Sequence, residues 1–477
     1  MRHLSQAYID GAFVPVQGSE VVDIINPATE GLIGTVTLGN RDDVRRAIDA
    51  AERAQPAFAR TTKQERIDML RHLQAAVLAR TDEIREATIE EYGGPLSRSQ
   101  WVSEYASQCF ANAVKTLEAY DFTRQVGEAT VVMEPVGVAA LMTPWNSTAG
   151  SICSKLASAI AAGCACVVKP SELSPIQTQV IAQAIHDAGL PPGVVNIVIG
   201  RGADVGNEIS IHPAIAKISF TGSTPTGKAI LRAGAETMKR VSLALTGKSA
   251  TIVLEDADLA KAIPLALSAG FLNNGQACIA GTRILVPRAR LAEVVELVKT
   301  TVGGLKVGDP RDPATVIGPL VNQAQYDRIQ HFIRAGLKEG ATLVVGSEGR
   351  PEKLVRGYFV KPTVFINVRN DMQIAREEIF GPVLCLMAYE DEEEAVRIAN
   401  DSAYGLQAYV FSSDLKRAQR VAARLEAGGV LINAIRPALT APFGGFKQSG
   451  LGREYGVFGL EAFLEAKTIV SASAVAA

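Results

Sequence analysis

The 477-residue sequence has no excess of either charge and no apolar run long enough to cross a bilayer. Its 48 lysines and arginines are balanced by 50 aspartates and glutamates, for a net charge of -2, so the composition offers no strongly basic surface for nucleic acid or an anionic membrane. The most apolar stretch, residues 156–168, is too short for a transmembrane helix, and no signal-peptide core follows Met1. We therefore expect a cytoplasmic protein with no nucleic-acid or membrane partner.

Histidine and cysteine are also scarce. The five histidines include no pair at the spacing of metal ligands. The six cysteines are scattered along a long chain, unlike the dense frameworks of small secreted domains. Cys164 and Cys166 lack the second pair that would complete a zinc site. The sequence therefore predicts neither a disulfide scaffold nor a metal centre.

Alternating helical and strand patterns occupy most of the chain, which is too long for a single ordinary core. Apolar residues at helical spacing predict helices at residues 45–57, 64–80 and 174–188. Short apolar runs predict strands at residues 137–142, 165–168, 194–199, 215–220, 250–254, 283–287, 383–387 and 429–433. This pattern is typical of βαβ units around a mostly parallel sheet. We therefore expect two consecutive Rossmann-like α/β domains.

Two glycine-containing turns follow predicted strands. Residues 200–206 place Gly202 and Gly206 near a dinucleotide-binding fingerprint, but the third glycine comes one position late. Residues 220–223 open a helix whose first N–H groups can hold a phosphate. In isolation, each segment is equally compatible with an ordinary turn.

Cys278 follows Asn274-Gly275-Gln276-Ala277 after an apolar helix. A thiol beside glycine can approach both a substrate and main-chain donors. A lone cysteine is nevertheless more often buried and inert than catalytic, so this segment needs its neighbours to carry a functional prediction.

Taken together, six segments resemble motifs of the aldehyde dehydrogenase superfamily, in the family's order and over essentially the whole chain. They are Pro144-Trp145-Asn146, Lys169-Pro170-Ser171-Glu172, Phe220-Thr221-Gly222-Ser223, Gly275-Gln276-Ala277-Cys278, residues 377–382 (EEIFGP) and residues 442–445 (PFGG). Residues 308–313 and 357–363 look closest to a bacterial branch that includes a 6-oxolauric acid dehydrogenase.

The resemblance implies an aldehyde dehydrogenase fold with three parts. Residues 1–119 and 136–246 would form the NAD-binding domain, and residues 247–450 the catalytic domain. Residues 120–135 and 462–473 would form a small β oligomerisation element, which in this family supports homodimers or homotetramers.

One ion pair is expected to connect this element to the first domain. Glu465 resembles a family glutamate that bridges two arginines, which would here be Arg240 and Arg453.

The resemblance also assigns the chemistry. Cys278 would attack the aldehyde carbon, and the resulting oxyanion would be held by the Asn146 side chain and the Cys278 main-chain N–H. A hydride would then pass to the nicotinamide, leaving a thioester. Because the thiolate is the reactive form, either the pKa of Cys278 must be lowered or a base must lie nearby.

The expected cofactor is NAD. Lys169 and Glu172 resemble contacts to the adenosine ribose, and the Glu172 carboxylate would repel the 2′-phosphate of NADP. Ser223 resembles a pyrophosphate contact, and Glu378 an acceptor for the nicotinamide ribose. The remaining residues expected around the cofactor are Trp145, Ser171, Gly202, Gly206, Phe220, Thr221, Gly222 and Phe380.

Ala244 is the main departure from the family pattern. The family usually has a glutamate here that activates the water for thioester hydrolysis, and alanine cannot accept a proton. Either the chain carries a deliberate substitution that traps the acyl-enzyme, or the protein naturally lacks this base. We favour the first interpretation, because the other catalytic motifs are intact. Glu454 resembles a family glutamate on a proton path.

Small side chains stand where the family's substrate tunnel is usually lined by bulky ones. The expected tunnel residues are Ser147, Ser151, Ser154, Ile279, Arg436 and Phe443. Three serines predict a wide tunnel and a bulky or long aldehyde. For Arg436, a solvated surface arginine is the slightly favoured alternative to a substrate contact.

Two other interpretations stay open. A catalytically silent NAD-binding homologue is supported only by Ala244, and the retained Cys278, Asn146 and Glu378 argue against it. A CoA-acylating dehydrogenase would not need the missing glutamate, but no CoA-specific feature is recognisable.

Overall fold

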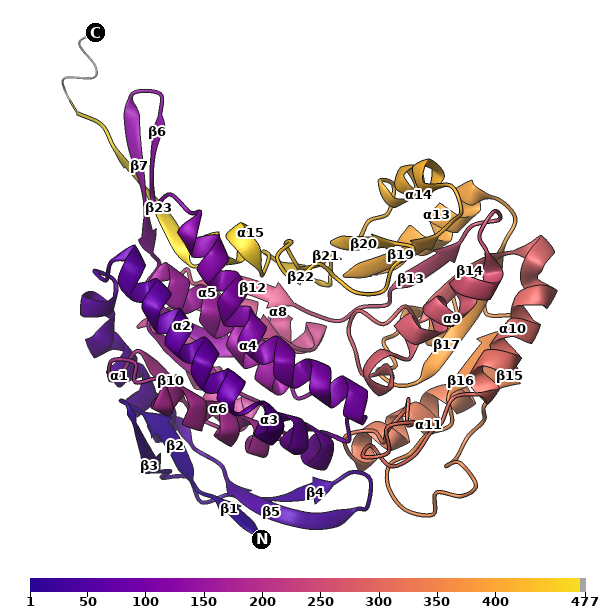
Figure 1. Cartoon of the computed structure of the whole chain (residues 1–477), viewed down its shortest axis with the longest axis horizontal. Coiled ribbons are helices and arrows are strands. Elements are labelled where there is room, and N and C mark those ends of the chain that lie inside the picture. The colour runs from indigo at the N-terminus through magenta and orange to yellow at the C-terminus, as the bar shows by residue number, and fades with distance from the viewer. Residues whose placement is uncertain (472–477) are drawn as a thin grey trace.

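Apolar runs in the sequence form the central strands of two large sheets. The computed structural model describes residues 1–471, which form two α/β domains side by side and a small sheet projecting from the first (Figure 1). Each of the eight strands expected from the sequence corresponds to an observed strand. The predicted fold class is thus confirmed.

The first domain is built on an eight-stranded sheet. Its strands, in spatial order, are β22 (Gly450–Leu451), β12 (Arg240–Ala244), β11 (Ile215–Thr221), β8 (Val138–Met142), β9 (Cys166–Lys169), β10 (Val195–Ile197), β2 (Gln6–Ile9) and β3 (Ala12–Pro15). The helices of this part of the chain are α1 (Arg41–Phe58), α2 (Lys63–Ala79), α3 (Thr81–Ala87), α4 (Leu96–Glu118), α5 (Thr148–Ala162), α6 (Pro175–Asp187), α7 (Asn207–Ile211), α8 (Thr224–Ala235) and α15 (Gly456–Glu461), with short turns η1 (Thr88–Tyr92) and η2 (Gly202–Gly206).

The second domain is built on a seven-stranded sheet. Its strands, in spatial order, are β15 (Thr342–Val345), β16 (Thr363–Ile366), β17 (Val383–Tyr389), β14 (Arg283–Pro287), β13 (Ala250–Val253), β19 (Gln407–Phe411) and β20 (Gly429–Ile432). Its helices are α9 (Leu259–Gly270), α10 (Leu291–Gly303), α11 (Gln323–Lys338), α12 (Gln373–Arg376), α13 (Glu392–Asn400) and α14 (Leu415–Ala422), with short turns η3 (Leu272–Gly275) and η4 (Arg288–Arg290).

Two smaller sheets lie outside the two large ones. Near the N-terminus, β1 (Arg2–Leu4), β5 (Gly31–Thr37) and β4 (Val21–Asn26) form one, and β18 (Tyr404–Gly405) pairs with β21 (Phe446–Lys447) in the other. Among the described residues, no helix is both long and apolar enough to cross a membrane. All six cysteines are free thiols.

The parallel core of the first sheet brings the ends of its strands to one edge. Met142 is in register with Lys169 and with Phe220, and Thr221 is in register with Ala244. Ligands of open α/β sheets bind beyond this carboxyl edge. The predicted cofactor residues and the unusual alanine therefore share one side of the sheet.

The chain crosses from one domain to the other directly after Ala244. Residues 245–249 connect β12 to β13, the first strand of the second sheet. Near the C-terminus, β22 returns to pair antiparallel with β12, where Gly450 faces Ala244. The two domains are therefore joined at the position that the family's base would occupy.

The projecting sheet has the strand order β23-β7-β6, from Leu464–Ile469, Ala129–Pro135 and Thr123–Val126 (Figure 1). The expected hairpin turns at Gly127, whose φ of 58° suits glycine. Residues 472 and 473 of the predicted element lie outside the described residues. Open strand edges of this kind can pair with another chain, so the sheet is suited to the expected role in assembly. That role stays a prediction.

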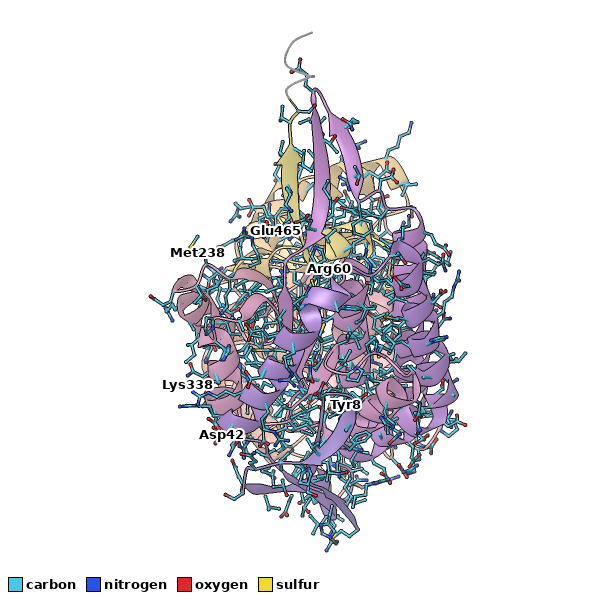
Figure 2. All side chains as sticks on the ribbon, turned by 90° about the vertical axis from the view of Figure 1, so that its left-hand side faces the viewer. Tyr8, Asp42, Arg60, Met238, Lys338 and Glu465 are labelled. Atoms are coloured by element: carbon cyan, nitrogen blue, oxygen red, sulfur yellow. The ribbon has the colours of Figure 1, made fainter. Side chains whose placement is uncertain are left out.

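Glu465 lies where the projecting sheet meets the body of the chain (Figure 2). It pairs with Arg240 at 2.5 Å, as expected. Within the described residues of the single chain, Glu465 forms no ion pair with Arg453, whose guanidinium donates to the main-chain oxygens of Gly445 and Gly452. The second bridge stays a prediction for the assembled protein. The connection between β23 and β12 therefore depends on one exposed pair.

We expect Glu465→Lys to weaken self-association while the chain stays folded. The substitution places two positive charges together at the base of the sheet, and exposed pairs contribute little to folding itself. Sedimentation velocity should show a shift toward smaller species, with a nearly unchanged melting temperature. Lys467→Glu is the matched control, because Lys467 pairs with Glu134 inside the sheet. Equal losses in both variants would contradict a specific role for the Arg240 bridge.

Candidate active site

The loop that carries Cys278 begins with three residues in left-handed conformation. Asn273, Asn274 and Gly275 have φ values of 58°, 59° and 73°. Asn274 anchors this turn, since its Nδ2 donates to the main-chain oxygen of Pro319 and its Oδ1 accepts from the Gly318 N–H. A run of strained residues persists only when its surroundings hold it, so the loop is rigidly placed.

Two close main-chain approaches fix the loop against its neighbours. A Cβ on Gly275 would lie 2.1 Å from the Gly381 carbonyl carbon, and one on Gly247 would lie 2.0 Å from the Cys278 oxygen. Neither distance is possible for a side-chain carbon. The Cys278 loop therefore contacts both the crossing segment and the EEIFGP segment through backbone alone.

Asn146 follows β8 and reaches across to this loop. Its Nδ2 donates to the Gln276 oxygen at 2.8 Å, and its own main-chain oxygen accepts from Asn273 Nδ2 at 2.9 Å. An amide nitrogen has two protons, so one remains for a substrate oxygen. The predicted oxyanion donor thus contacts the loop that carries the predicted nucleophile, two residues before Cys278.

Cys278 is the one partly exposed cysteine among six, and the other five are buried. Burial, followed by the negative charge of Glu378, raises the pKa of its thiol to about 12. Of the two alternatives that the sequence leaves open, a lowered pKa or a nearby base, the raised pKa favours the nearby base. Low dielectric disfavours the thiolate, so this nucleophile depends on a group that accepts its proton.

Glu378 lies beside the crossing segment. Its Oε1 accepts a hydrogen bond from the Gly247 N–H at 3.1 Å. Burial raises the pKa of its carboxyl to about 7, against opposing contributions that include the Gly247 hydrogen bond and the charge of Lys248. Glu378 therefore changes charge near neutral pH, close to Cys278.

Ala244 ends β12 and is 3% exposed. Its methyl group offers no proton acceptor, and the crossing segment reaches Cys278 only three residues later, at Gly247. Residue 244 therefore lies at the start of the segment that contacts the Cys278 loop, and its role as the position of the family's base stays a prediction.

Glu454 is the other carboxylate whose charge raises the pKa of Cys278. It forms a short ion pair with Lys155, and Lys155 Nζ also donates to Ser219 Oγ at 3.1 Å. These three side chains line a small cavity together with Ser242.

A groove of about 420 Å³ runs along the carboxyl edge of the first sheet. It gathers nine of the twelve predicted cofactor residues: Trp145, Lys169, Ser171, Glu172, Gly202, Gly206, Phe220, Thr221 and Gly222. Ser223 caps α8 next to the groove. Phe380, from the other domain, meets Trp145 edge-on at 5.3 Å. The groove has the size of a small-molecule site, and cofactor binding by these residues stays a prediction.

Arg201 is a groove-side residue that the sequence reasoning missed. Its guanidinium pairs with Glu172 at 3.3 Å and with Glu20 at 2.7 Å. Lys169 lies on the other side of Glu172 at 3.7 Å, and burial lowers the pKa of that lysine. Two cations therefore hold the Glu172 carboxylate. The feature of the sequence that could have identified Arg201 is its position between two glycines, Gly200 and Gly202.

The predicted tunnel serines lie on or next to α5, facing α4. A Cβ on Gly150 would lie 2.7 Å from the Tyr105 ring, and Tyr105 donates its hydroxyl proton to the Tyr455 hydroxyl at 2.7 Å. Ser154 lines a cavity beside both tyrosines. The aromatic side chain of α4 thus fills part of the space left by small residues on α5, which limits the width expected from the serines alone.

The other predicted tunnel residues are more dispersed. Phe443 stacks on Tyr455 with ring centroids 5.6 Å apart. The Ile279 main-chain oxygen accepts from the Tyr409 hydroxyl at 2.9 Å. Arg436 is exposed, and it forms no ion pair within residues 1–471. The contacts of Arg436 therefore do not distinguish a substrate contact from a solvated surface residue.

The comparisons with known proteins agree with the geometry. A model of the aldehyde dehydrogenase family matches residues 13–469. A 3-succinoylsemialdehyde-pyridine dehydrogenase from a Pseudomonas species is 45% identical over 472 residues, covering 98% of this chain and 99% of that protein.

The chain is also similar to solved structures of aldehyde dehydrogenases. Aldehyde dehydrogenase C from Pseudomonas syringae, a Cys-to-Ala variant in complex with NAD+ and octanal, has a TM-score of 0.96 and 45% identity, covering 98% of this chain and 96% of that one. Betaine aldehyde dehydrogenase from Staphylococcus aureus, in complex with NAD+, has a TM-score of 0.94 and 36% identity, covering 98% and 94%.

The raised thiol pKa predicts how Cys278 reacts with iodoacetamide. The rate should increase roughly tenfold per pH unit, without a plateau up to about pH 10, because the thiolate fraction keeps rising. Glu378→Gln removes a negative charge that raises the thiol pKa, so labelling should be faster above about pH 7. Below that pH the Glu378 carboxyl is protonated, and the two proteins should converge. Peptide mass spectrometry would locate the label.

Cys278→Ser serves as the control, since the remaining cysteines are buried and should label slowly. A plateau in the rate for the unmodified chain near the ordinary thiol pKa of about 8.5 would contradict the raised value.

Proposed function

The chain belongs to the aldehyde dehydrogenase family, and we propose that it oxidises an aldehyde with NAD through a covalent bond to Cys278. We further propose that the step after oxidation is impaired by Ala244. The observation that supports the first part is the contact between the Asn146 amide and the Cys278 loop. The support for the second is the buried methyl group at residue 244.

In the proposed reaction, the Cys278 thiol gives its proton to one of the two carboxylates whose charges act on it, Glu378 or Glu454, and its sulfur bonds to the aldehyde carbon. The carbonyl oxygen takes up negative charge, and the Asn146 amide and the Cys278 main-chain N–H donate to it. NAD, when bound, supplies the acceptor for the hydride that leaves this carbon. What remains on Cys278 is a thioester, which water must cleave to release the carboxylic acid.

In the proposed reaction, two acidic residues, Glu378 and Glu454, accept protons or hydrogen bonds in different steps. Glu378, with its pKa near neutrality, faces the crossing segment and can accept from a ribose hydroxyl. Glu454, held by Lys155, is the remaining carboxylate whose charge reaches Cys278. We propose that Glu454 supports slow residual hydrolysis through the small cavity that it lines with Lys155.

Ala244 predicts a burst of about one NADH per active site, followed by very slow turnover. Acylation and hydride transfer do not need the absent carboxylate, whereas deacylation does, and a general base contributes roughly 100- to 10,000-fold. Stopped-flow absorbance should record the burst, and intact-protein mass spectrometry should find the acyl mass on Cys278. Ala244→Glu should raise the steady state with little change in the burst.

Cys278→Ser is the control and should give neither burst nor adduct. Rapid turnover of the unmodified chain with no burst would overturn the proposed block. Resolution of the adduct by added CoA, with release of acyl-CoA, would instead favour a CoA-acylating dehydrogenase. An absence of NADH with every aldehyde would favour a silent NAD-binding homologue.

We propose that Ala244 stands for a glutamate removed from an otherwise complete enzyme. The retained Cys278, Asn146, Glu378 and groove residues support this interpretation. A protein without a catalytic role has no need to keep them together. Recovery of turnover by Ala244→Glu would support this interpretation.

Glu172 should make NAD a better cofactor than NADP. The carboxylate, held by Lys169 and Arg201, would repel a 2′-phosphate. Glu172→Ala removes this repulsion and frees Arg201, so the relative use of NADP should increase roughly tenfold or more. Burst rates at limiting cofactor would measure the ratio.

The matched control is Glu20→Ala, which releases Arg201 from its other partner but leaves Glu172 in place. Its cofactor preference should stay close to that of the unmodified chain. If the unmodified chain uses NADP as well as NAD, the electrostatic argument fails.

The substrate is proposed to be a bulky or long aldehyde. The relatives are named for a pyridine-bearing semialdehyde and solved with octanal, and the serines of α5 leave room that only Tyr105 partly fills. Arg436 is proposed to lie at the tunnel mouth. The active form is proposed to be a homodimer or homotetramer joined through the projecting sheet.

A further inference from the structure

Arg98, in the first turn of α4, is a cation without an acidic partner. Its Nε donates to Asn273 Oδ1 at 3.1 Å, and its guanidinium carbon lies 4.3 Å from the centre of the Trp101 ring. Within residues 1–471, no carboxylate forms an ion pair with it, and its two terminal nitrogens have no hydrogen-bond partner in the chain. The outer fork of the guanidinium is therefore available.

Arg98 is only partly exposed to solvent. Burial lowers the pKa of its guanidinium to about 10, because a low dielectric disfavours the charged form. The cation is therefore partly desolvated at the place where it contacts Asn273 and Trp101.

Asn273 connects this cation to the reaction centre. The same side chain that accepts from Arg98 donates through Nδ2 to the main-chain oxygens of Asn146 and Gln276. Arg98 is thus one side chain away from the proposed oxyanion donor. Its contact with Asn273 joins residues 175 positions apart in the sequence.

The same face of α4 carries aromatic side chains toward the predicted tunnel. Trp101 stacks on Tyr105 at 4.9 Å, and Tyr105 contacts Gly150 and bonds to Tyr455. This wall has an apolar surface and a single cation at its end. A half-buried charge without a counterion is costly, and an anionic ligand would offset that cost.

We propose that Arg98 binds the carboxylate of an aldehyde substrate whose far end is acidic. The proposal rests on the proposed function and narrows its substrate class. The two terminal nitrogens present a fork that matches a carboxylate, and the Trp101 and Tyr105 rings line the apolar part of the chain between the carboxylate and the aldehyde. Arg98 would be a specificity-determining residue.

Paired substrates of equal length test this assignment. The half-saturating concentration of the NADH burst is measured with succinic semialdehyde and with butanal, for the unmodified chain and for Arg98→Gln. Loss of a charge-assisted hydrogen bond should raise the value for the acidic aldehyde by roughly 10- to 100-fold. The value for butanal should change little. Arg98→Lys should recover part of the loss, because it restores the charge without the fork.

Lys115→Gln is the matched control, since it removes an exposed positive charge from the far end of the same helix. Equal losses for both aldehydes in Arg98→Gln and Arg98→Lys would overturn the proposal and assign Arg98 to holding Asn273 alone. A selective loss in Arg436→Gln, and not in the Arg98 variants, would move the carboxylate site to the tunnel mouth. Should the unmodified chain give no burst with any aldehyde, the proposed function itself would fail.

A second readout does not depend on oxidation. Butyrate should slow the alkylation of Cys278 in the unmodified chain more than butyramide does, and Arg98→Gln should abolish the difference. Melting temperatures would show whether each variant is folded. Equal protection by the acid and the amide in the unmodified chain would also overturn the proposal.

Discussion

Cys278 is held in place by contacts between main-chain segments that leave no space for side chains. The crossing segment meets the Cys278 carbonyl at Gly247, and the EEIFGP segment meets Gly275. Each contact brings together parts of the chain far apart in sequence, and each tolerates only glycine. The left-handed run at residues 273–275 is the local result. The position of the thiol relative to the groove, to Asn146 and to Glu378 therefore depends on backbone packing between the two domains.

The same packing sets the electrostatics. Excluding water around the loop raises the pKa values of both Cys278 and Glu378, so at neutral pH the nucleophile is protonated and one carboxylate is poised to change its charge. A site of this kind strengthens hydrogen bonds to a developing oxyanion. It also makes the missing acceptor at Ala244 more consequential, because bulk water cannot readily replace it.

The sequence predicts best what depends on local pattern. A largely apolar run such as residues 283–287 becomes a buried strand with the expected bounds. β12 was missed because Ser242 and Arg240 interrupt its apolar character, although pairing with β11 buries the serine. The residues of the groove were predicted as one cofactor site because their motifs resemble those of the family. Arg98 and Arg201 were missed, because their significance comes mainly from partners supplied by distant segments.

The return of β22 to the first sheet has a consequence for biosynthesis. The edge of β12 stays unpaired until residues 450 and 451 have been made, and β7 waits similarly for β23. Domains generally fold as they leave the ribosome, with the N-terminal part first. Here the first domain cannot close its sheet on that schedule. A nascent chain stalled in the second domain would expose an open strand edge beside the groove, which makes late elongation the stage most vulnerable to aggregation.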